Sequence, residues 1–235
     1  MKIAVAHDWL NQMGGAENVL ETMISMFPDA PVFTTIYASD LMPAKYRGWD
    51  IRASWLNNAP YIHAHHQMYL PFYPLAARSL DVSGYDVVLS NKSGFIHGIK
   101  TTSNQTHICY CLAPTRYVWD YKQYAQREQL NPFIKLTLLP IIYLLRKWDY
   151  RMAQNVSQFY AISTDIQQRI KKYYHRESKI IYPPVDIARF QPVKSPNEDY
   201  YFIVSRLVPY KRIDLAVQAF TRMKKRLVIT GDGSS

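Results

Sequence analysis

Short apolar runs alternate with longer segments of helical periodicity along most of the chain, and this alternation constrains the fold more than any other feature. Runs such as Ile3 to Ala6 and Tyr85 to Ser90 are almost continuously apolar, which is typical of strands buried on both faces of a sheet. The predicted strands are residues 3–6, 31–37, 85–90, 106–111, 159–162 and 179–182, and the predicted helices are 15–27, 67–79, 117–126, 133–155 and 165–174. Strands that alternate with helices predict a doubly wound parallel sheet, a Rossmann-like α/β domain.

The organisation changes after the dipeptide Pro183-Pro184. Residues 184–199 contain further prolines and little apolar periodicity, which predicts a linker after an α/β domain at residues 1–183. Residues 200–235 contain a predicted strand, helix and strand at 200–204, 213–223 and 227–230, which form one βαβ unit of a second Rossmann-like domain. A unit of this size cannot bury both its helix and its sheet faces. We therefore expect it to pack on the first domain, or the native protein to continue beyond Ser235.

The charge balance points to an anionic partner. The 235 residues carry 28 Lys and Arg against 18 Asp and Glu, a formal net charge of +10. Such an excess favours nucleic acid, an acidic lipid surface or a phosphorylated small molecule. Because no recognised nucleic-acid motif accompanies the charge, a nucleic-acid partner is not predicted. The longest apolar stretch, residues 132–145, is shorter than the roughly 20 residues that span a bilayer, and no signal peptide is recognisable, so the expected location is the cytoplasm.

The cysteines and histidines do not predict a metal site. Cys109 and Cys111 lie two residues apart in a predicted strand, where both point to one face, and no second pair exists to complete a zinc site. We interpret them as small buried hydrophobes. The cluster of His63, His65 and His66 has no neighbouring carboxylate or cysteine and matches no zinc-binding spacing, so we interpret it as a surface or interface segment.

Two loops combine the residues expected at a ligand site. The first, HDWLNQMGGAE at residues 7–17, follows the first strand, where ligands of open α/β sheets bind. Gly14 and Gly15 allow a close backbone approach, and the following helix start offers free N–H groups to a phosphate; alternatively, the two glycines only form a tight turn. The second loop, SRLVPYKRID at residues 205–214, places Arg206 and Lys211 between a strand and a helix. This pair suits a diphosphate, or is a solvated basic turn.

These loops, taken with the order of elements, resemble glycosyltransferase family 4, whose members have the two-domain GT-B fold. HDWLNQMGGAENVLE at residues 7–21 is similar to the opening segment of the family, and SRLVPYKRIDLAVQAF at 205–220 is similar to its signature at the start of the second domain. VITGDGSS at 228–235 resembles the strand and turn that follow that signature. CLAPTRYVWD at 111–120 resembles a segment of members that build bacterial surface polysaccharides.

The resemblance implies transfer of a sugar from a nucleotide-diphosphate donor, with retention of anomeric configuration and without a metal or other cofactor. It implies that Arg206 and Lys211 bind the diphosphate and stabilise the leaving group, and that Gly14 and Gly15 bring N–H groups to the donor phosphates. The acceptor, lipid-linked or saccharide, is expected near five residues of the first domain: His7, Asp8, Trp9, Arg116 and Trp119. Mannose from a guanosine diphosphate donor is the expected sugar. The family's later pair of glutamates is absent, so this chain is expected to be inactive alone.

The segment from Phe133 to Arg151 combines regularly spaced leucines with basic residues and Trp148. This pattern suits a helix on an anionic membrane surface, or a long core helix of the first domain. A second basic cluster, from Arg169 to Lys179, adds to the charge expected at the inner face of a membrane. The alternative function is therefore a non-catalytic membrane-binding or partner-binding subunit.

Overall fold

The computed structural model describes residues 1–122, 125, 131–188, 199–208, 211–231 and 233. The chain divides into two compact units. One comprises Met1–Tyr121 with Thr137–Val185, and the other comprises Lys122–Leu136 with Asp186–Ser235. The domain boundaries expected at residues 183 and 199 stay predictions.

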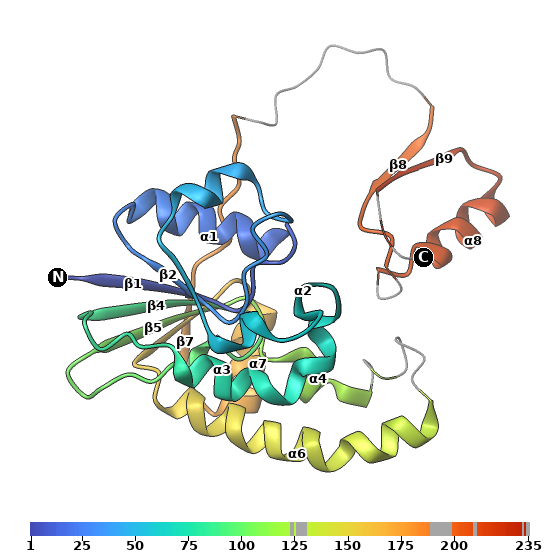
Figure 1. Cartoon of the computed structure of the whole chain (residues 1–235). Helices are drawn as coiled ribbons and strands as arrows, with labels where there is room; N and C mark the ends of the chain where they lie inside the picture. The colour runs from blue at the N-terminus through green and yellow to red at the C-terminus, as the bar shows by residue number, and fades with distance from the viewer. Residues whose placement is uncertain (123–124, 126–130, 189–198, 209–210, 232, 234–235) are drawn as a thin grey trace. The chain divides into compact units, whose positions relative to one another are not determined.

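The first unit is built on a seven-stranded sheet in which every neighbouring pair is parallel. The strands are β1 (Ile3–His7), β2 (Val32–Thr34), β3 (Ile51–Ala53), β4 (Val87–Lys92), β5 (Thr106–Cys111), β6 (Gln158–Ala161) and β7 (Ser178–Ile180). Their order across the sheet is β3-β2-β1-β4-β5-β6-β7 (Figure 1). The doubly wound Rossmann-like sheet predicted from the sequence is therefore confirmed.

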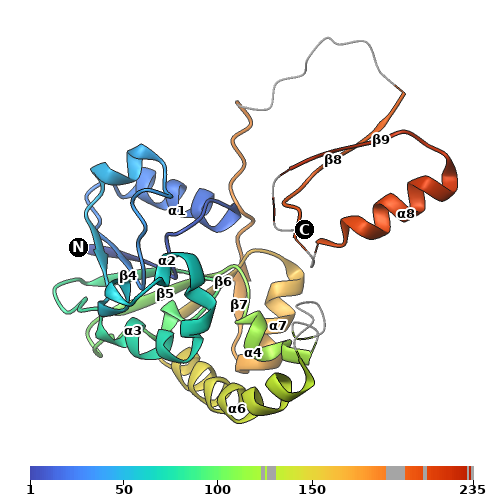
Figure 2. The same ribbon diagram turned by 45° about the vertical axis from the view of Figure 1, so that its right-hand side comes forward.

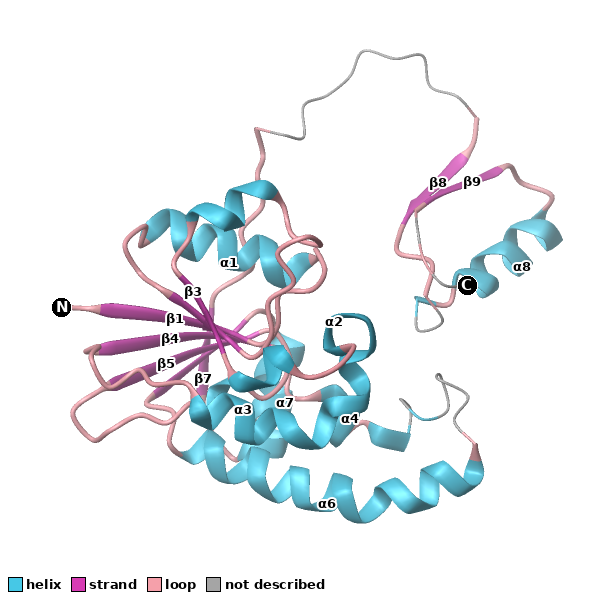
Figure 3. Ribbon diagram, viewed as in Figure 1, coloured by secondary structure: helices cyan, strands magenta, loops and turns pink. Residues whose placement is uncertain are grey.

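Helices cover both faces of this sheet (Figure 2 and Figure 3). The α-helices are α1 (Gly15–Met26), α2 (Ile62–His65), α3 (Tyr73–Ser79), α4 (Arg116–Trp119), α6 (Pro132–Gln154) and α7 (Thr164–Tyr174), and the 3-10 helices are η1 (Ala44–Gly48), η2 (Trp55–Asn58), η3 (His66–Phe72) and η4 (Ile96–Gly98). α1 packs on the face that carries Val5 and Tyr110. α3 packs on the face that carries Ala4 and Ala6, and α6 and α7 pack on the side that carries Cys109.

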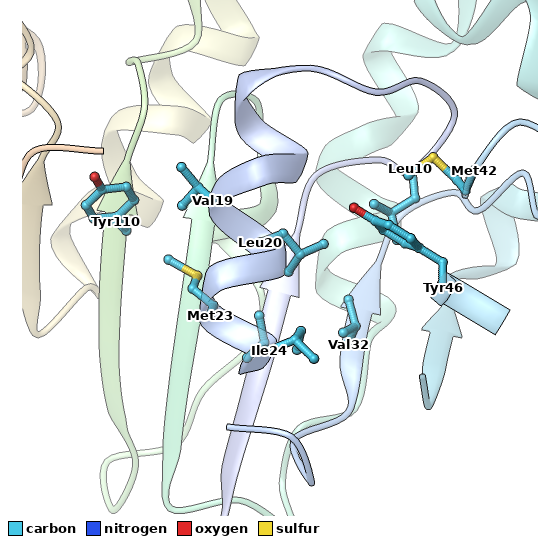
Figure 4. Close-up of a cluster of buried hydrophobic side chains, with 10 residues drawn as sticks. Leu10, Val19, Leu20, Met23, Ile24, Val32, Met42, Tyr46 and Tyr110 are labelled. Atoms are coloured by element: carbon cyan, nitrogen blue, oxygen red, sulfur yellow. The ribbon is translucent and has the colours of Figure 1, made fainter. Parts of the chain in front are cut away.

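The α1 cluster shows why this segment is helical. Val19, Leu20, Met23 and Ile24 repeat at three- and four-residue spacing, and all four are buried against the sheet (Figure 4). Leu20 is fully buried, which contributes about 1.5–3 kcal/mol relative to an exposed side chain. The helix ends at Met26, just before Pro28, which cannot continue the helical hydrogen-bond ladder.

Several predicted elements differ in the structure. The predicted helix at 67–79 is divided into η3 and α3, since Pro71 and Pro74 each lack a backbone N–H. The predicted strand at 31–37 is ladder-paired only over Val32–Thr34. β3 was not predicted, because three residues that include Arg52 carry no strand-like pattern. Of the predicted helix at 117–126, α4 accounts for the first turn, and residues 123–124 and 126 lie outside the described residues.

The second unit contains the predicted βαβ arrangement. β8 (Tyr201–Val204) and β9 (Leu227–Thr230) form a parallel pair, and α8 (Ile213–Met223) connects them. Phe202, Val204 and Val217 are 56%, 71% and 45% exposed. These exposures agree with the expectation that one βαβ unit cannot bury its own apolar faces.

Candidate functional site

The strand order of the first unit reverses between β1 and β4, which is the position where open α/β sheets bind ligands at the carboxyl ends of their strands. The register pairs His7 at the end of β1 with Asn91 at the end of β4. Lys92, the next residue, pairs with Cys111 at the end of β5. The loops that leave these three strands therefore define the candidate site of the first unit.

Asp8 fixes the loop that follows β4. Its carboxylate accepts hydrogen bonds from the backbone N–H groups of Ser93 at 2.6 Å, Gly94 at 2.6 Å and Ile96 at 2.8 Å. The side chain is buried, so these bonds replace its hydration. A Cβ atom on Gly94 would lie 2.7 Å from the ring of Trp9 and 2.8 Å from Asp8 Oδ1, so only glycine fits there.

His7 lies beneath the start of α1 in a buried polar network. Asn91 Nδ2 is 2.8 Å from the carbonyl oxygen of Ala16, which can only accept, so the amide orientation is fixed. The same Nδ2 lies 3.2 Å from His7 Nδ1, which must therefore accept. His7 Nε2 then carries the proton and donates to Glu17 Oε1 at 3.3 Å. His7 is buried, so its predicted direct contact with an acceptor stays a prediction.

Gly14 and Gly15 form the turn into α1. Gly14 is the N-cap residue, with extended backbone that any residue adopts. A Cβ atom on Gly14 would lie 3.2 Å from Glu17 Oε2, whereas one on Gly15 would meet nothing within 4 Å. The turn is therefore tight on the side of Glu17 and open at Gly15. The predicted contact of Gly14 and Gly15 with donor phosphates stays a prediction.

Trp9 is held by the segment that contains the three histidines. Its ring centroid lies 5.7 Å from that of His66 and 5.5 Å from that of Tyr73. Asn11 Nδ2 donates to the carbonyl oxygen of His63 at 3.2 Å and lies 3.0 Å from His66 Nδ1. Among the described residues, no group of three or more His, Cys, Asp and Glu side chains is placed to hold a metal ion. His66 and the carbonyl group of His63 thus contact the loop after β1, whereas His65 is exposed.

A buried lysine at the end of β4 was missed in the sequence. Lys92 is fully buried, and its Nζ donates to the carbonyl oxygen of Ala113 and to Thr115 Oγ1, each at 3.2 Å. Thr115 Oγ1 in turn lies 2.9 Å from Asp149 Oδ1, and Asp149 is fully buried too. Asp149 therefore supplies the negative charge that compensates Lys92, through the threonine hydroxyl. The available signal was a lysine two residues after the apolar strand predicted at 85–90.

Asp149 also fixes one of the predicted acceptor residues. Its Oδ2 accepts from Trp119 Nε1 at 2.6 Å and from Tyr174 Oη at 2.7 Å. Burial and the charge of Asp149 raise the pKa of Tyr174 well above its usual value, so this hydroxyl keeps its proton. The Trp119 ring stacks on that of Tyr173, with centroids 4.8 Å apart. Arg116, the first residue of α4, is exposed. The acceptor roles of Trp119 and Arg116 stay predictions.

Other titratable groups near this network are uncharged. Burial, with the charge of Lys92, lowers the pKa of His97 to about 3, and burial lowers that of His107 to about 4. Burial raises the pKa of Cys111 to about 12 and that of Cys109 well above its usual value. Both thiols are fully buried, which confirms their interpretation as small hydrophobes.

The second unit carries the other predicted site residues. Arg206 lies after β8 and Lys211 lies just before α8, and both are exposed. The turn that follows β9 closes against this loop. A Cβ atom on Gly231 would lie 1.7 Å from the carbonyl oxygen of Ser205, and one on Gly233 would lie 1.9 Å from that of Leu207. The two glycines thus let the turn approach the loop that bears Arg206, a contact that the sequence did not reveal.

No family model and no curated protein match the sequence. Among solved structures, the chain is similar to Anabaena Alr3699/HepE, which was crystallised in complex with UDP, at 16% sequence identity and a TM-score of 0.63. This match covers 100% of this chain and 62% of that one, so the chain spans less than two thirds of that protein. The wall teichoic acid polymerase TagF matches at 12% identity and a TM-score of 0.44, over 99% of this chain and 56% of that one. The likeness to HepE shows a shared Rossmann-like fold.

Proposed function

We propose that the chain is the acceptor-side part of a glycosyltransferase that transfers a sugar from a nucleoside-diphosphate sugar, in the synthesis of a cell-surface polysaccharide. The observation that carries this proposal is the Rossmann-like architecture shared with HepE, a protein that was crystallised with UDP. The loops at residues 7–21 and 205–220 resemble those of glycosyltransferase family 4, and this resemblance supports the proposal that the sugar is transferred with retention of anomeric configuration. That resemblance also favours mannose from a guanosine diphosphate donor.

The donor diphosphate is proposed to bind the loop between β8 and α8. Arg206 offers a planar fork of N–H donors, and Lys211 offers a compact positive charge. Gly231 and Gly233 approach the backbone of this loop at Ser205 and Leu207 more closely than a side chain would allow. Cations fixed at the leaving diphosphate stabilise the negative charge that develops as the glycosidic bond breaks, and so they can replace a divalent metal.

The acceptor is proposed to lie at the carboxyl edge of the first unit's sheet, with Arg116 as its most accessible contact. Arg116 directly follows Thr115, whose hydroxyl joins Lys92 to Asp149. The hydrogen bonds that the Asp8 carboxylate accepts from the loop after β4 fix that loop as well. A platform held by buried charged groups is preorganised, so it loses little entropy when it binds an acceptor.

The diphosphate assignment is tested by titrating the chain with GDP and UDP and following backbone amide shifts by NMR. Arg206→Ala and Lys211→Ala should each weaken binding by about tenfold or more, since hydrogen bonds to charged groups contribute about 1.5–3 kcal/mol. Arg212→Ala is the matched control, because Arg212 pairs with Asp214 at 3.0 Å. Equal binding by all three variants contradicts the assignment.

A membrane surface is the proposed location of the acceptor, and α6 is the proposed contact. Ile142, Leu145 and Met152 are buried on one side of this helix. The opposite side exposes an apolar and basic stripe that comprises Leu139, Tyr143, Leu144, Lys147 and Arg151. No described helix is long and apolar enough to cross a bilayer. A helix with an apolar, basic outer face suits the interface of an anionic bilayer, whether the chain is an enzyme or a non-catalytic subunit.

Vesicle sedimentation tests this membrane proposal. The chain should bind vesicles that contain phosphatidylglycerol, and less so as salt rises, because basic residues contribute to the attraction. Leu144→Glu should reduce binding strongly. Leu41→Glu, at a 57% exposed leucine outside α6, should not. Binding that ignores salt, or equal binding by both variants, contradicts the proposed contact.

A further inference from the structure

An exposed apolar stripe lies on the outer side of η3 and α3, two consecutive helices of the first unit. It consists of Met68, Phe72 and Leu75, which are 78%, 46% and 59% exposed. These residues recur at spacings of four and three, so they lie on one side of the helical segment. The opposite side packs in the core through Ala77. The three side chains are therefore gathered into one surface, which is typical of an interaction site rather than of scattered exposed residues.

The sequence around the stripe carries no negative charge. Residues 51–80 contain neither Asp nor Glu, whereas Arg78 follows Leu75 by one turn and is exposed. An apolar surface flanked by arginine and free of carboxylates in its own segment is complementary to the headgroups and acyl chains of anionic lipids. The chain as a whole has a formal net charge of +10, which adds to the attraction.

The stripe adjoins α6, the helix that is proposed to contact the membrane. Arg78 Nη1 donates to Met152 Sδ of α6 at 3.3 Å. The helices α3 and α6 lie side by side in both views (Figure 1 and Figure 2). The stripe and the exposed side of α6 therefore belong to neighbouring helices.

Both helices cover the same face of the sheet. Ala77 of α3 packs with Ala6 of β1. Ala153 of α6 packs with Cys109 of β5. Ala6 and Cys109 each pair with Ser90 in β4, so their side chains point to one face. The outer sides of α3 and α6 consequently point away from the same face of the sheet, and one flat partner can contact both.

We propose that the stripe of Met68, Phe72 and Leu75 is a second bilayer contact, so that the first unit docks on an anionic membrane through α3 and α6 together. The inference rests on the proposed function for the α6 contact. Two contacts fix the orientation of the unit on the bilayer, whereas a single helix leaves it free to turn about the helix axis.

The back of the stripe supports the proposed acceptor site. The ring centroid of Trp9, which follows β1, lies 5.7 Å from that of His66 in η3 and 5.5 Å from that of Tyr73 in α3. Docking through the stripe therefore brings the bilayer next to the elements that hold this loop.

A fluorescent label at position 68 measures whether the stripe enters the bilayer. Both native cysteines are fully buried, and burial raises the pKa of their thiols, so the exposed thiol of Met68→Cys reacts selectively with an environment-sensitive dye. On vesicles of phosphatidylglycerol and phosphatidylcholine, the emission should shift to shorter wavelength, and brominated acyl chains should quench it. The control is Ser25→Cys on α1, which packs on the opposite face of the sheet, and its label should neither shift nor be quenched.

Vesicle sedimentation measures the contribution of the stripe to binding. The double variant Met68→Ser with Leu75→Ser removes apolar surface without changing the net charge, and it should bind about tenfold or more weakly. Both side chains are exposed, so thermal melts of the variant should match those of the unsubstituted chain. Met26→Ser, at a 64% exposed methionine of α1, is the matched control and should bind like the unsubstituted chain.

A shifted and quenched label at position 68, with weaker binding by the double variant, supports the inference. An unchanged label on a chain that binds vesicles overturns it and leaves the α6 contact standing. A shift that grows with protein concentration in the absence of vesicles assigns the stripe to a second copy of this chain and also overturns the inference. Equal binding to vesicles of phosphatidylcholine alone contradicts the choice of an anionic surface.

The inference and the proposed donor site fail separately, because nucleotide binding is measured without vesicles. Insertion of the stripe by a chain that binds neither GDP nor UDP supports the inference and contradicts the donor assignment. Nucleotide binding that depends on Arg206, in a chain whose label at position 68 stays unchanged on vesicles, supports the donor assignment and overturns the inference.

Discussion

Replacement of Asp149 by Asn tests how much the negative charge of Asp149, which compensates the buried Lys92, contributes to stability. A new amide can keep the hydrogen bonds, since its oxygen can accept from Trp119 and Tyr174 and its NH₂ group can donate to Thr115 Oγ1, which lies 2.9 Å away. The Thr115 hydroxyl can then donate to the carbonyl oxygen of Gly94 at 2.7 Å. What is lost is the negative charge, so the fully buried Lys92 ammonium remains without a counterion.

Leaving a buried charge without compensation costs about 3–5 kcal/mol, and we expect Asp149→Asn to lower the free energy of unfolding by up to that amount. Urea titration followed by the fluorescence of Trp119 and Trp148 measures it. Adding Lys92→Met should recover much of the loss, because both charges are then absent. The control is Asp120→Asn, whose partly exposed pair with Arg169 contributes about 0–1 kcal/mol. If Asp149→Asn lowers the free energy of unfolding by less than about 1 kcal/mol, Asp149 does not compensate the charge of Lys92. The same conclusion follows if the losses of the two single variants add up in the double variant.

Two further predictions follow from buried groups of the first unit. An unfolded histidine has a pKa near 6.5, whereas burial lowers the pKa of His97 to about 3 and that of His107 to about 4. Below about pH 6.5 the unfolded chain therefore binds more protons than the folded chain. The free energy of unfolding falls as the pH drops from about 6.5 to about 4. Each histidine contributes up to about 1.4 kcal/mol per pH unit, and His107→Gln should reduce the slope of unfolding free energy against pH accordingly. Gly98→Ala should lower the free energy of unfolding by about 1–3 kcal/mol or more, because its Cβ atom would lie 2.0 Å from the ring of Trp148. Gly84→Ala, where the new Cβ atom meets open space, should leave the free energy of unfolding unchanged. Thermal melts compare the two variants.

The spacing of apolar residues was enough to predict helices and strands whose apolar side chains are also the ones that pack in the fold. The strand predicted at 106–111 and the helix predicted at 213–223 coincide with β5 and α8. It failed where a local residue overrides the pattern, as Pro71 does in the segment that forms η3. The three residues of β3 gave no pattern, because a short edge strand is defined by its pairing with β2 rather than by its own side chains.

The candidate site was predicted in position but not in detail. The order of strands placed His7 and Asp8 at the carboxyl edge of the sheet, and the structure confirms that placement. The sequence could not show that both side chains point into the fold, since burial depends on residues more than eighty positions away, such as Asn91 and Gly94. The link from Lys92 through Thr115 to Asp149 likewise joins distant segments, and no local pattern predicts it.

Whether this chain binds a sugar-nucleotide donor is decided by titrating it with nucleoside diphosphates and following the binding residue by residue by NMR. We expect GDP or UDP to shift the amide signals of Arg206, Gly231 and Gly233, and Arg206→Ala to remove these shifts. Shifts confined to other surfaces, or no shifts at millimolar nucleotide, would contradict the assignment of this loop to a sugar-nucleotide donor.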